Sequence, residues 1–82
     1  MRSRCYTIRN LEGLHARPSA VLIKIAQAHG CRLLVKVKDQ WQEAGIMNLL
    51  MLCAHEGAAL ELAADGGDEE KCLKEIKRVL EG

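Results

Sequence analysis

Apolar and polar residues first alternate with a period of two, which predicts a β-strand over residues 4–9. This alternation would direct Tyr6 and Ile8 toward a core and Cys5 and Thr7 away from it. The strand is the first of seven short elements that the pattern predicts along the chain.

A helical period follows. Residues 10–13 have the character of a turn, and residues 19–29 contain neither glycine nor proline. Pro18 suits the first turn of a helix, where its missing N–H costs nothing, and Gly30 suits the C-terminal cap. Spacings of i, i+3, i+4 and i+7 predict one buried face made of Ser19, Leu22, Ile23 and Ala26.

The next two predicted strands form a hairpin. Asp39 and Gln40 are expected to turn the chain into a short third strand around Trp41 and Gln42. The second strand places three apolar residues on one face, namely Leu33, Val35 and Val37. The alternate positions, with one residue of a later strand, suit a sheet face open to water; they are Arg32, Lys36, Lys38 and Glu61.

The rest of the chain predicts one strand and two helices. Gly45 opens an apolar segment, residues 46–52, that we expect to be helical, and Leu60 and Leu62 mark a fourth strand that ends at residues 65–67.

The last helix carries the clearest signals at both ends. Asp68 can cap it, Glu69 and Glu70 suit its first turn, and Lys77 and Arg78 suit its last turn. Its apolar face consists of Cys72, Leu73, Ile76, Val79 and Leu80. The order β-α-β-β-α-β-α predicts an α+β open-faced sandwich, in which three helices cover one face of a four-stranded, mainly antiparallel sheet.

Composition narrows the class of function. The 82 residues fit a single domain, residues 1–82, and the only aromatic side chains are Tyr6 and Trp41, so stacking platforms for nucleic acid are not expected. The formal net charge is +1 and the basic residues are scattered, which argues against binding to nucleic acid or to an anionic membrane. With no segment that resembles a signal peptide or a membrane span, we expect a cytoplasmic monomer.

The cysteines and histidines do not have the spacing of a metal site. Cysteines occur at four widely separated positions without a C-x-x-C pair, so we expect small, mostly buried side chains with no disulfide or redox role; they are Cys5, Cys31, Cys53 and Cys72. A metal site built with His15, His29 and His55 is disfavoured, because His29 falls at the far end of the helix from His15 and His55 lies in a separate turn. We therefore predict no metal and no cofactor.

The chemistry concentrates in Gly-Leu-His-Ala-Arg-Pro, residues 13–18. His15 is expected just outside the N-terminus of the first helix, where orphan N–H groups and the helix dipole favour an anion. Arg17 adds a planar fork of donors matched to phosphate oxygens, so we assign phosphate binding to Ala16 and Arg17. A lone histidine here would most often be an ordinary surface residue. A titratable nucleophile, a phosphate-shaped cation and a helix start within four residues favour a functional site.

With a second motif, Gly-Ile-Met-Asn-Leu-Leu-Met-Leu at residues 45–52, the chain resembles HPr, the histidine-containing phosphocarrier of the bacterial sugar phosphotransferase system. The resemblance implies that His15 accepts a phosphoryl group on its Nδ1 atom from phosphorylated enzyme I and passes it to IIA domains of sugar permeases. Arg17 would stabilise that group and help in its transfer. The protein would then be a covalent intermediate rather than an independent catalyst, and calling it a transferase is a matter of naming.

The resemblance also implies a docking surface for both partners. A two-turn helix on a small domain can bury only about half of the apolar residues in 46–52, and we expect Met47 and Leu50 to be exposed. Ala20 and Val21, which lie off the core face of the first helix, could extend this patch, as could Ile25. All of the apolar residues could instead be core, but methionines suit adaptable partner surfaces.

The chain departs from the family at three positions. Many Gram-positive members carry a serine, the target of a regulatory kinase, where this chain has Gly45. Asn48 and Cys53 stand where the family often has glycine; the first is compatible with a helix, and the second leaves the path of the chain after it open.

Two other functions remain open on the sequence. One is a nitrogen-related or regulatory paralogue that uses the same histidine to signal to other proteins. The other is an interaction module that keeps the fold without being phosphorylated, against which the presence of both His15 and Arg17 speaks.

Overall fold

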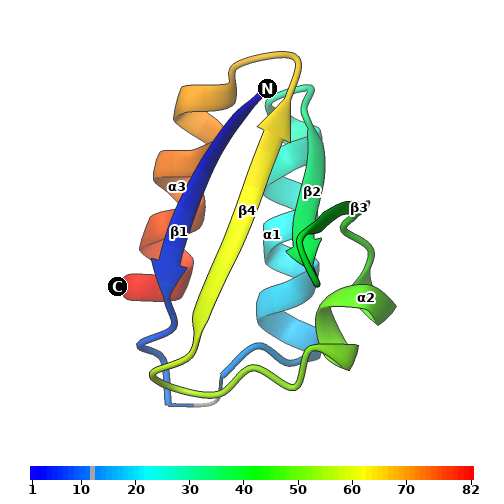
Figure 1. The fold of residues 1–82 in the computed structure, drawn as a ribbon. Helices are drawn as coiled ribbons and strands as arrows, with labels where there is room; N and C mark the ends of the chain where they lie inside the picture. The colour runs from blue at the N-terminus through cyan, green and yellow to red at the C-terminus, as the bar shows by residue number, and fades with distance from the viewer. Residues whose placement is uncertain (12) are drawn as a thin grey trace.

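The computed structural model describes residues 1–11 and 13–82, and it confirms the predicted order β-α-β-β-α-β-α (Figure 1). The three helices are α1 (Ala16–Ala28), α2 (Ile46–Met51) and α3 (Glu69–Glu81). The strands are β1 (Arg2–Thr7), β2 (Arg32–Val37), β3 (Gln40–Glu43) and β4 (Ala59–Asp65). They form one sheet in the order β1-β4-β2-β3, and each neighbouring pair is antiparallel.

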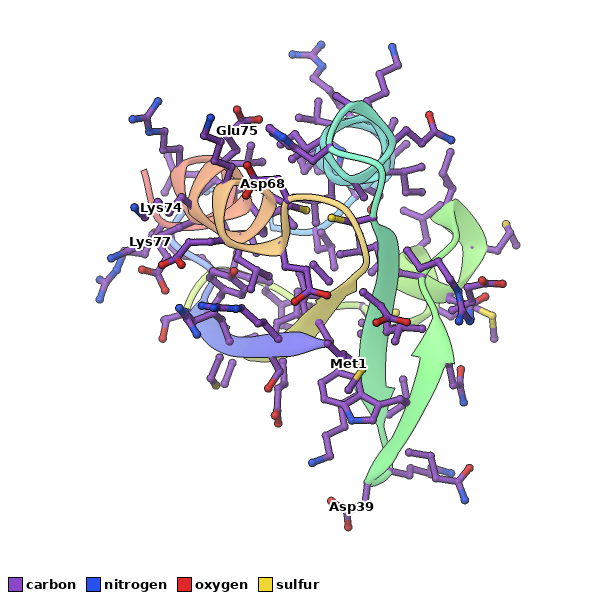
Figure 2. The ribbon with its side chains drawn as sticks, turned by 90° about the horizontal axis from the view of Figure 1, so that it is seen from above. Met1, Asp39, Asp68, Lys74, Glu75 and Lys77 are labelled. Atoms are coloured by element: carbon purple, nitrogen blue, oxygen red, sulfur yellow. The ribbon has the colours of Figure 1, made fainter. Side chains whose placement is uncertain are left out.

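The core lies between the sheet and the helices. Seen from above, α1 and α3 lie on one side of the sheet (Figure 2). Tyr6 and Ile8 are buried while Cys5 is exposed, as the alternation predicts. Leu22 and Ile76 come from the two long helices and are fully buried. Because aromatic side chains are scarce, interdigitated aliphatic side chains fill this layer.

The other face of the sheet carries the expected charged side chains, together with the buried Leu34 and Ala63. Lys36 of β2 forms an ion pair with Glu61 of β4, with the Nζ and Oε1 atoms 3.8 Å apart. The same ammonium group lies 5.5 Å from the ring centroid of Trp41 in β3, within cation–π range. Lys38 is exposed but belongs to a turn rather than to the strand.

Three predicted boundaries are shifted. The hairpin turns at Lys38 and Asp39, both with positive φ, because Gln40 already pairs with Val37 in the ladder. Two central residues of positive φ match the right-handed twist of the flanking strands. The first strand runs from Arg2 to Thr7 rather than over 4–9. Its bounds are set by pairing with β4, which extends from Arg2 to Thr7 and so begins before the alternating residues.

The first helix starts at Ala16, before the predicted stretch of 19–29. Its buried residues are Ser19, Leu22 and Ala26, with Ile23 half-buried, which confirms the predicted face. Part of the turn predicted over residues 10–13 is described, since the Gly13 N–H donates to the Asn10 carbonyl over 3.1 Å, whereas residue 12 lies outside the described residues.

The expectation of mostly buried cysteines is wrong, because only Cys72 is buried. Cys5 is exposed on the outer face of β1, and Cys53 is exposed in the turn after α2. Cys31 is half-buried between α1 and β2. Cysteine composition carries no positional information, and the strand alternation already placed Cys5 outside.

None of the helices within the described ranges is long and apolar enough to cross a lipid bilayer.

Candidate functional site

His15 is the N-cap of α1, as predicted, and the preceding segment is anchored to the rest of the fold. Leu14 is buried in the core, and its N–H donates to the Ala54 carbonyl over 2.9 Å. This bond ties the approach to α1 to the loop that follows α2. The position of His15 is therefore set by two segments distant in sequence.

Gly13 allows this close approach. Its φ is +73°, and a Cβ built on it would lie 2.7 Å from the Ala54 carbonyl oxygen. Both features disfavour any other residue. Asn10 braces the turn, because its side-chain amide donates to the Gly13 carbonyl over 2.8 Å. Gly13 and Asn10 thus position the candidate histidine, a role that the sequence pattern did not reveal.

The first turn of α1 presents backbone donors at the surface beside His15. Ala16 and Arg17 are exposed, Pro18 has no N–H, and the Ser19 N–H donates to the His15 carbonyl over 3.0 Å. The turn contains no acidic residue. This terminus therefore carries the positive end of a 13-residue helix without a carboxylate of its own to offset it.

Arg17 contributes an exposed cation next to these donors. Its side chain is exposed, and no ion pair within residues 1–11 and 13–82 holds its guanidinium group. It is therefore available to an anion bound at this helix terminus.

Helix α2 packs beside the first turns of α1 (Figure 1). Leu49 is fully buried, whereas Met47 is 67% exposed and Met51 is 76% exposed. At about 100° per residue, both methionines lie about 160° around the helix from Leu49, on the face directed away from the core. The predicted exposure of Met47 is confirmed.

Leu50 was predicted to be exposed, but its side chain is half-buried. Leu50 lies about 100° from Leu49 and therefore on the flank of the helix rather than on its outer face. Ile46 at the start of α2 is more exposed than Leu50. Apolar composition alone could not distinguish these positions in a segment whose one polar residue is Asn48.

On α1, Val21 is exposed and Ala20 is half-buried, so both reach the surface. Ile25 is half-buried and packs against the core. We use the name methionine patch for the exposed apolar side chains of α1 and α2, which are Val21, Ile46, Met47 and Met51.

The structure shows the surroundings of two residues, Gly45 and Asn48, at which the chain differs from the family pattern. Gly45 is the N-cap of α2, and a Cβ added there would meet nothing within 4 Å. Asn48 faces the hairpin, where its amide donates to the Glu43 carbonyl over 3.0 Å.

Cys53 adopts a φ of +50° where the chain leaves α2. Its N–H donates to the Leu50 carbonyl over 3.1 Å, which closes the last turn of the helix. This left-handed conformation is the one that glycine adopts without cost.

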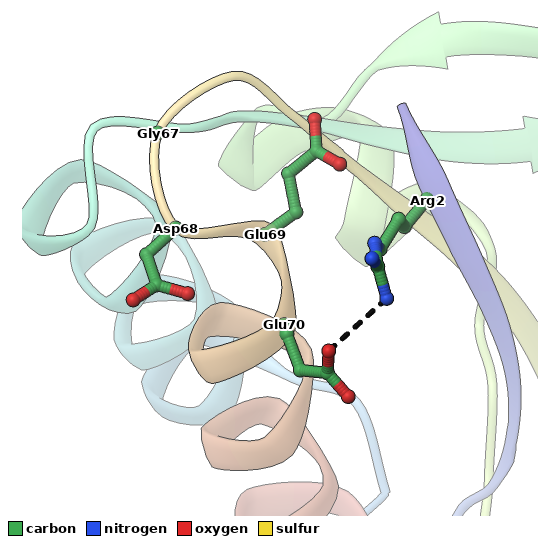
Figure 3. A pocket seen from close by; sticks show the side chains of 5 residues that line it. All are labelled: Arg2, Gly67, Asp68, Glu69 and Glu70. Carbon is green, nitrogen blue, oxygen red and sulfur yellow. Dashed lines mark hydrogen bonds and ion pairs between the residues drawn. The ribbon is translucent and has the colours of Figure 1, made fainter.

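A hollow of 520 Å³ at the start of α3 does not suit an anion. It is lined by Arg2, Gly67, Asp68, Glu69 and Glu70 (Figure 3). Arg2 already pairs with Glu70 over 3.1 Å. Its remaining carboxylates would repel phosphate.

No cluster suited to a metal ion occurs among the described side chains. His29 is at the C-terminal end of α1, where its Nε2 atom lies 3.2 Å from Oε1 of Glu75, and His55 is exposed in another loop. His29 therefore stands at the opposite end of α1 from His15, as the sequence predicts, whereas the backbone of His55 packs against Gly13.

Comparison with known proteins gives a consistent result. Residues 2–82 match the family model described as the PTS HPr component phosphorylation site. The phosphocarrier protein HPr of Neisseria meningitidis serogroup A is 33% identical over 76 residues, 92% of this chain and 85% of that protein. The phosphocarrier protein NPr of Escherichia coli K12 is 33% identical over 72 residues, 84% of this chain and 79% of that protein.

A crystal structure of HPr from Thermoanaerobacter tengcongensis has the same fold, with a TM-score of 0.82 at 30% identity over 99% of this chain and 92% of that one. The fold therefore defines an HPr-like open-faced sandwich. With the family model and the relatives above, it shows that the chain belongs to the HPr family of phosphocarrier proteins of the phosphotransferase system.

Proposed function

We propose that the chain accepts a phosphoryl group on His15 from phosphorylated enzyme I and passes it to the IIA domains of sugar permeases, as a cytoplasmic monomer. The observation that carries this proposal is the position of His15 as the N-cap of a 13-residue helix, beside exposed backbone donors and Arg17.

The chemistry of each step follows from this arrangement. The imidazole Nδ1 atom attacks phosphorus, the N–P bond forms, and the bond from phosphorus to the donor breaks. Charge on the three phosphoryl oxygens is then stabilised by the N–H groups of Ala16 and Arg17 and by the Arg17 guanidinium. The oxygens stay at the surface, where the next acceptor can reach phosphorus. His15 is therefore a carrier rather than a storage site.

The methionine patch supports a docking role for the same end of the molecule. Its side chains flank the first turns of α1, so a partner bound there would approach His15 with its own reacting group. Unbranched, polarisable methionines adapt to surfaces of different shape, which suits a carrier that meets both a donor and an acceptor.

The most direct test is a phosphorylation assay. Incubating the protein with phosphoenolpyruvate and a generic enzyme I should add about 80 Da to the intact mass, and mild acid should remove it, because a phosphoramidate is acid-labile whereas a serine phosphoester is not. A protein that gains no mass beside a phosphorylated HPr control contradicts the proposal.

A second candidate function is a role in the nitrogen-related branch. The observation that favours it is the similarity to NPr of Escherichia coli K12, which equals the similarity to the Neisseria HPr at 33% identity. Mixing the phosphorylated protein with a sugar-specific IIA domain and with a nitrogen-type IIA domain distinguishes the two roles by which acceptor gains the phosphoryl group faster.

A further inference from the structure

Two thiols are in contact at the end of the molecule opposite His15. Cys31 lies between α1 and β2, and Cys72 lies in α3. The two thiols interact, because a hydrogen bond between them lowers the pKa of Cys31 and raises the pKa of Cys72. The Cys31 thiol in turn lies 2.8 Å from the Gly66 carbonyl oxygen, to which it donates. The pair thus joins two segments that are about 40 residues apart in the sequence.

The backbone around the pair holds the two sulfurs together. The Asp68 N–H donates to the His29 carbonyl over 3.0 Å, so the loop before α3 is bonded to the end of α1. A Cβ on Gly67 would overlap that same carbonyl, which shows how closely the two loops pack. The contact of His29 Nε2 with Glu75 Oε1 bridges the helices beside them, and Figure 2 shows Asp68 and Glu75 between α1 and α3.

The two thiols differ in access to solvent. Cys72 is fully buried, whereas Cys31 is half-buried. A small oxidant in solution therefore reaches Cys31 first. Cys72 can react only with a group already on Cys31.

The pKa values of the two thiols also indicate that Cys31 reacts first and Cys72 second. Burial raises the pKa of Cys72 to about 12, and burial with nearby carboxylates also raises the pKa of Cys31 above its ordinary value. The hydrogen bond from Cys72 acts in the opposite direction on Cys31, because it stabilises a thiolate there. Of the two, Cys31 is the thiol that ionises more readily, and its oxidation should be slower than that of a low-pKa sensor cysteine.

We propose that Cys31 and Cys72 are a site of reversible oxidative modification, at which hydrogen peroxide converts the two thiols into an intramolecular disulfide. The Cys31 thiolate attacks one peroxide oxygen, the O–O bond breaks, and a sulfenic acid and water form. The Cys72 sulfur then attacks the Cys31 sulfur, the S–O bond breaks, and the hydroxyl group leaves with the Cys72 proton as a second water. Two thiols are oxidised and one peroxide is reduced.

This site goes beyond the proposed carrier function and does not depend on it. A helix of 13 residues separates it from His15, a distance of about 20 Å along the axis. The disulfide would close a loop of about 40 residues and so stabilise the fold, with an expected rise in melting temperature of roughly 10 °C.

The test uses hydrogen peroxide on the full chain, with the exposed thiols removed by Cys5→Ser and Cys53→Ser in one arm. In both arms we expect a loss of about 2 Da and, after proteolysis without reductant, a peptide pair that links residue 31 to residue 72. Dithiothreitol should reverse both. Cys31→Ser is the matched control, because this half-exposed position tolerates a hydroxyl, and it should abolish the link and leave the Cys72 thiol unoxidised.

Three results would overturn the proposal. One is a disulfide that joins another pair of cysteines while Cys31 and Cys72 stay reduced. Another is Cys31 that proceeds to sulfinic acid, a gain of about 32 Da, with the Cys72 thiol intact in a protein whose melting curve shows it to be folded. The third is full oxidation of Cys5 and Cys53 in the native chain with no change at either member of the pair.

Discussion

The two long helices have the same length, but the side chains at their N-termini differ in charge. At α3 the chain supplies its own negative charge: Asp68 accepts a hydrogen bond from the Lys71 N–H over 3.2 Å, and Glu69 and Glu70 follow in the first turn (Figure 3). At α1 the corresponding turn has no acidic residue and carries Arg17 beside the N-cap His15. The positive end of the helix is therefore satisfied by side chains at α3, whereas the described first turn of α1 offers no such side chain and suits the external anion that we propose.

The difference teaches that one physical feature serves stability in one place and chemistry in another. A capped terminus gains stability from its side chains. An uncapped one gives up part of that gain and keeps its donors for a ligand. Substitutions at the two termini should therefore affect different measurements.

The largest effect is expected from His15→Ala. It should abolish phosphoryl acceptance from enzyme I, because the substitution removes the imidazole that we propose as the acceptor. The unfolding free energy should change by no more than about 1 kcal/mol, because His15 is a half-buried N-cap residue. Intact mass and thermal melting measure the two properties. The control His55→Ala should accept phosphate normally, and acid-labile phosphate on the His15→Ala protein would count against the site.

Arg17→Ala should slow phosphoryl transfer roughly 10- to 100-fold while acceptance is retained, because the backbone donors of α1 remain in place. The transfer rate of Arg17→Lys should lie between those of the native protein and Arg17→Ala, since lysine keeps the charge and loses the planar fork of donors. Rapid-quench measurement of transfer to a IIA domain gives the rates. Complete loss of acceptance, equal to that of His15→Ala, would mean that Arg17 has a larger role than the helix terminus.

Met47→Glu should raise the KM for transfer from enzyme I about tenfold with little change in melting temperature, because the exposed charge must lose water only when a partner docks. Met51→Glu tests the neighbouring position in the same way. Leu50→Glu is the contrast: as a half-buried side chain it should cost stability as well. If Met47→Glu unfolds the domain, the docking face has been misplaced.

Asp68→Ala is the counterpart at α3. Loss of the cap should lower the unfolding free energy by about 1 kcal/mol, because the Lys71 N–H loses its acceptor. Phosphoryl acceptance at His15 should stay unchanged. Urea denaturation together with the enzyme I assay measures both, and a parallel loss of acceptance would show that the two termini are not independent.

The smallest effect on stability is expected from Gly45→Ser, which should add a few tenths of a kcal/mol as a better N-cap in a position with open space for the side chain. An HPr kinase should leave the native chain unmodified at the start of α2, because Gly45 offers no oxygen. Acid-stable phosphate within residues 43–50 of the native chain would contradict this. The variant serves as the positive control; if it too stays unmodified, neighbours such as Asn48 also matter.

Periodicity predicted most of the fold because burial on one face decides most of these elements. The predicted core faces of α1 and α3 are confirmed, and so is the cap at Asp68. The hairpin turn moved by one residue, because strand pairing rather than turn composition fixes where the ladder ends. Local residue types do not record that pairing.

The candidate site shows the same division. The place of His15 and the exposure of Met47 follow from local spacing, and both are confirmed. The bond of Leu14 to Ala54 and the contact of Cys31 with Cys72 join segments distant in sequence, so no local pattern contains them. Leu50 was misjudged because the orientation of a two-turn helix is set by its packing on α1.

The most direct test of the contrast between the two termini is a pair of amide 15N–1H spectra, recorded before and after phosphorylation with phosphoenolpyruvate and enzyme I. The account predicts that the largest shifts fall on the amides of Ala16 and Arg17, with those of Glu69 and Glu70 unchanged, and that phosphorus is coupled to the His15 ring. Phosphate on His29 or His55, or amides of Ala16 and Arg17 that do not respond, would contradict it.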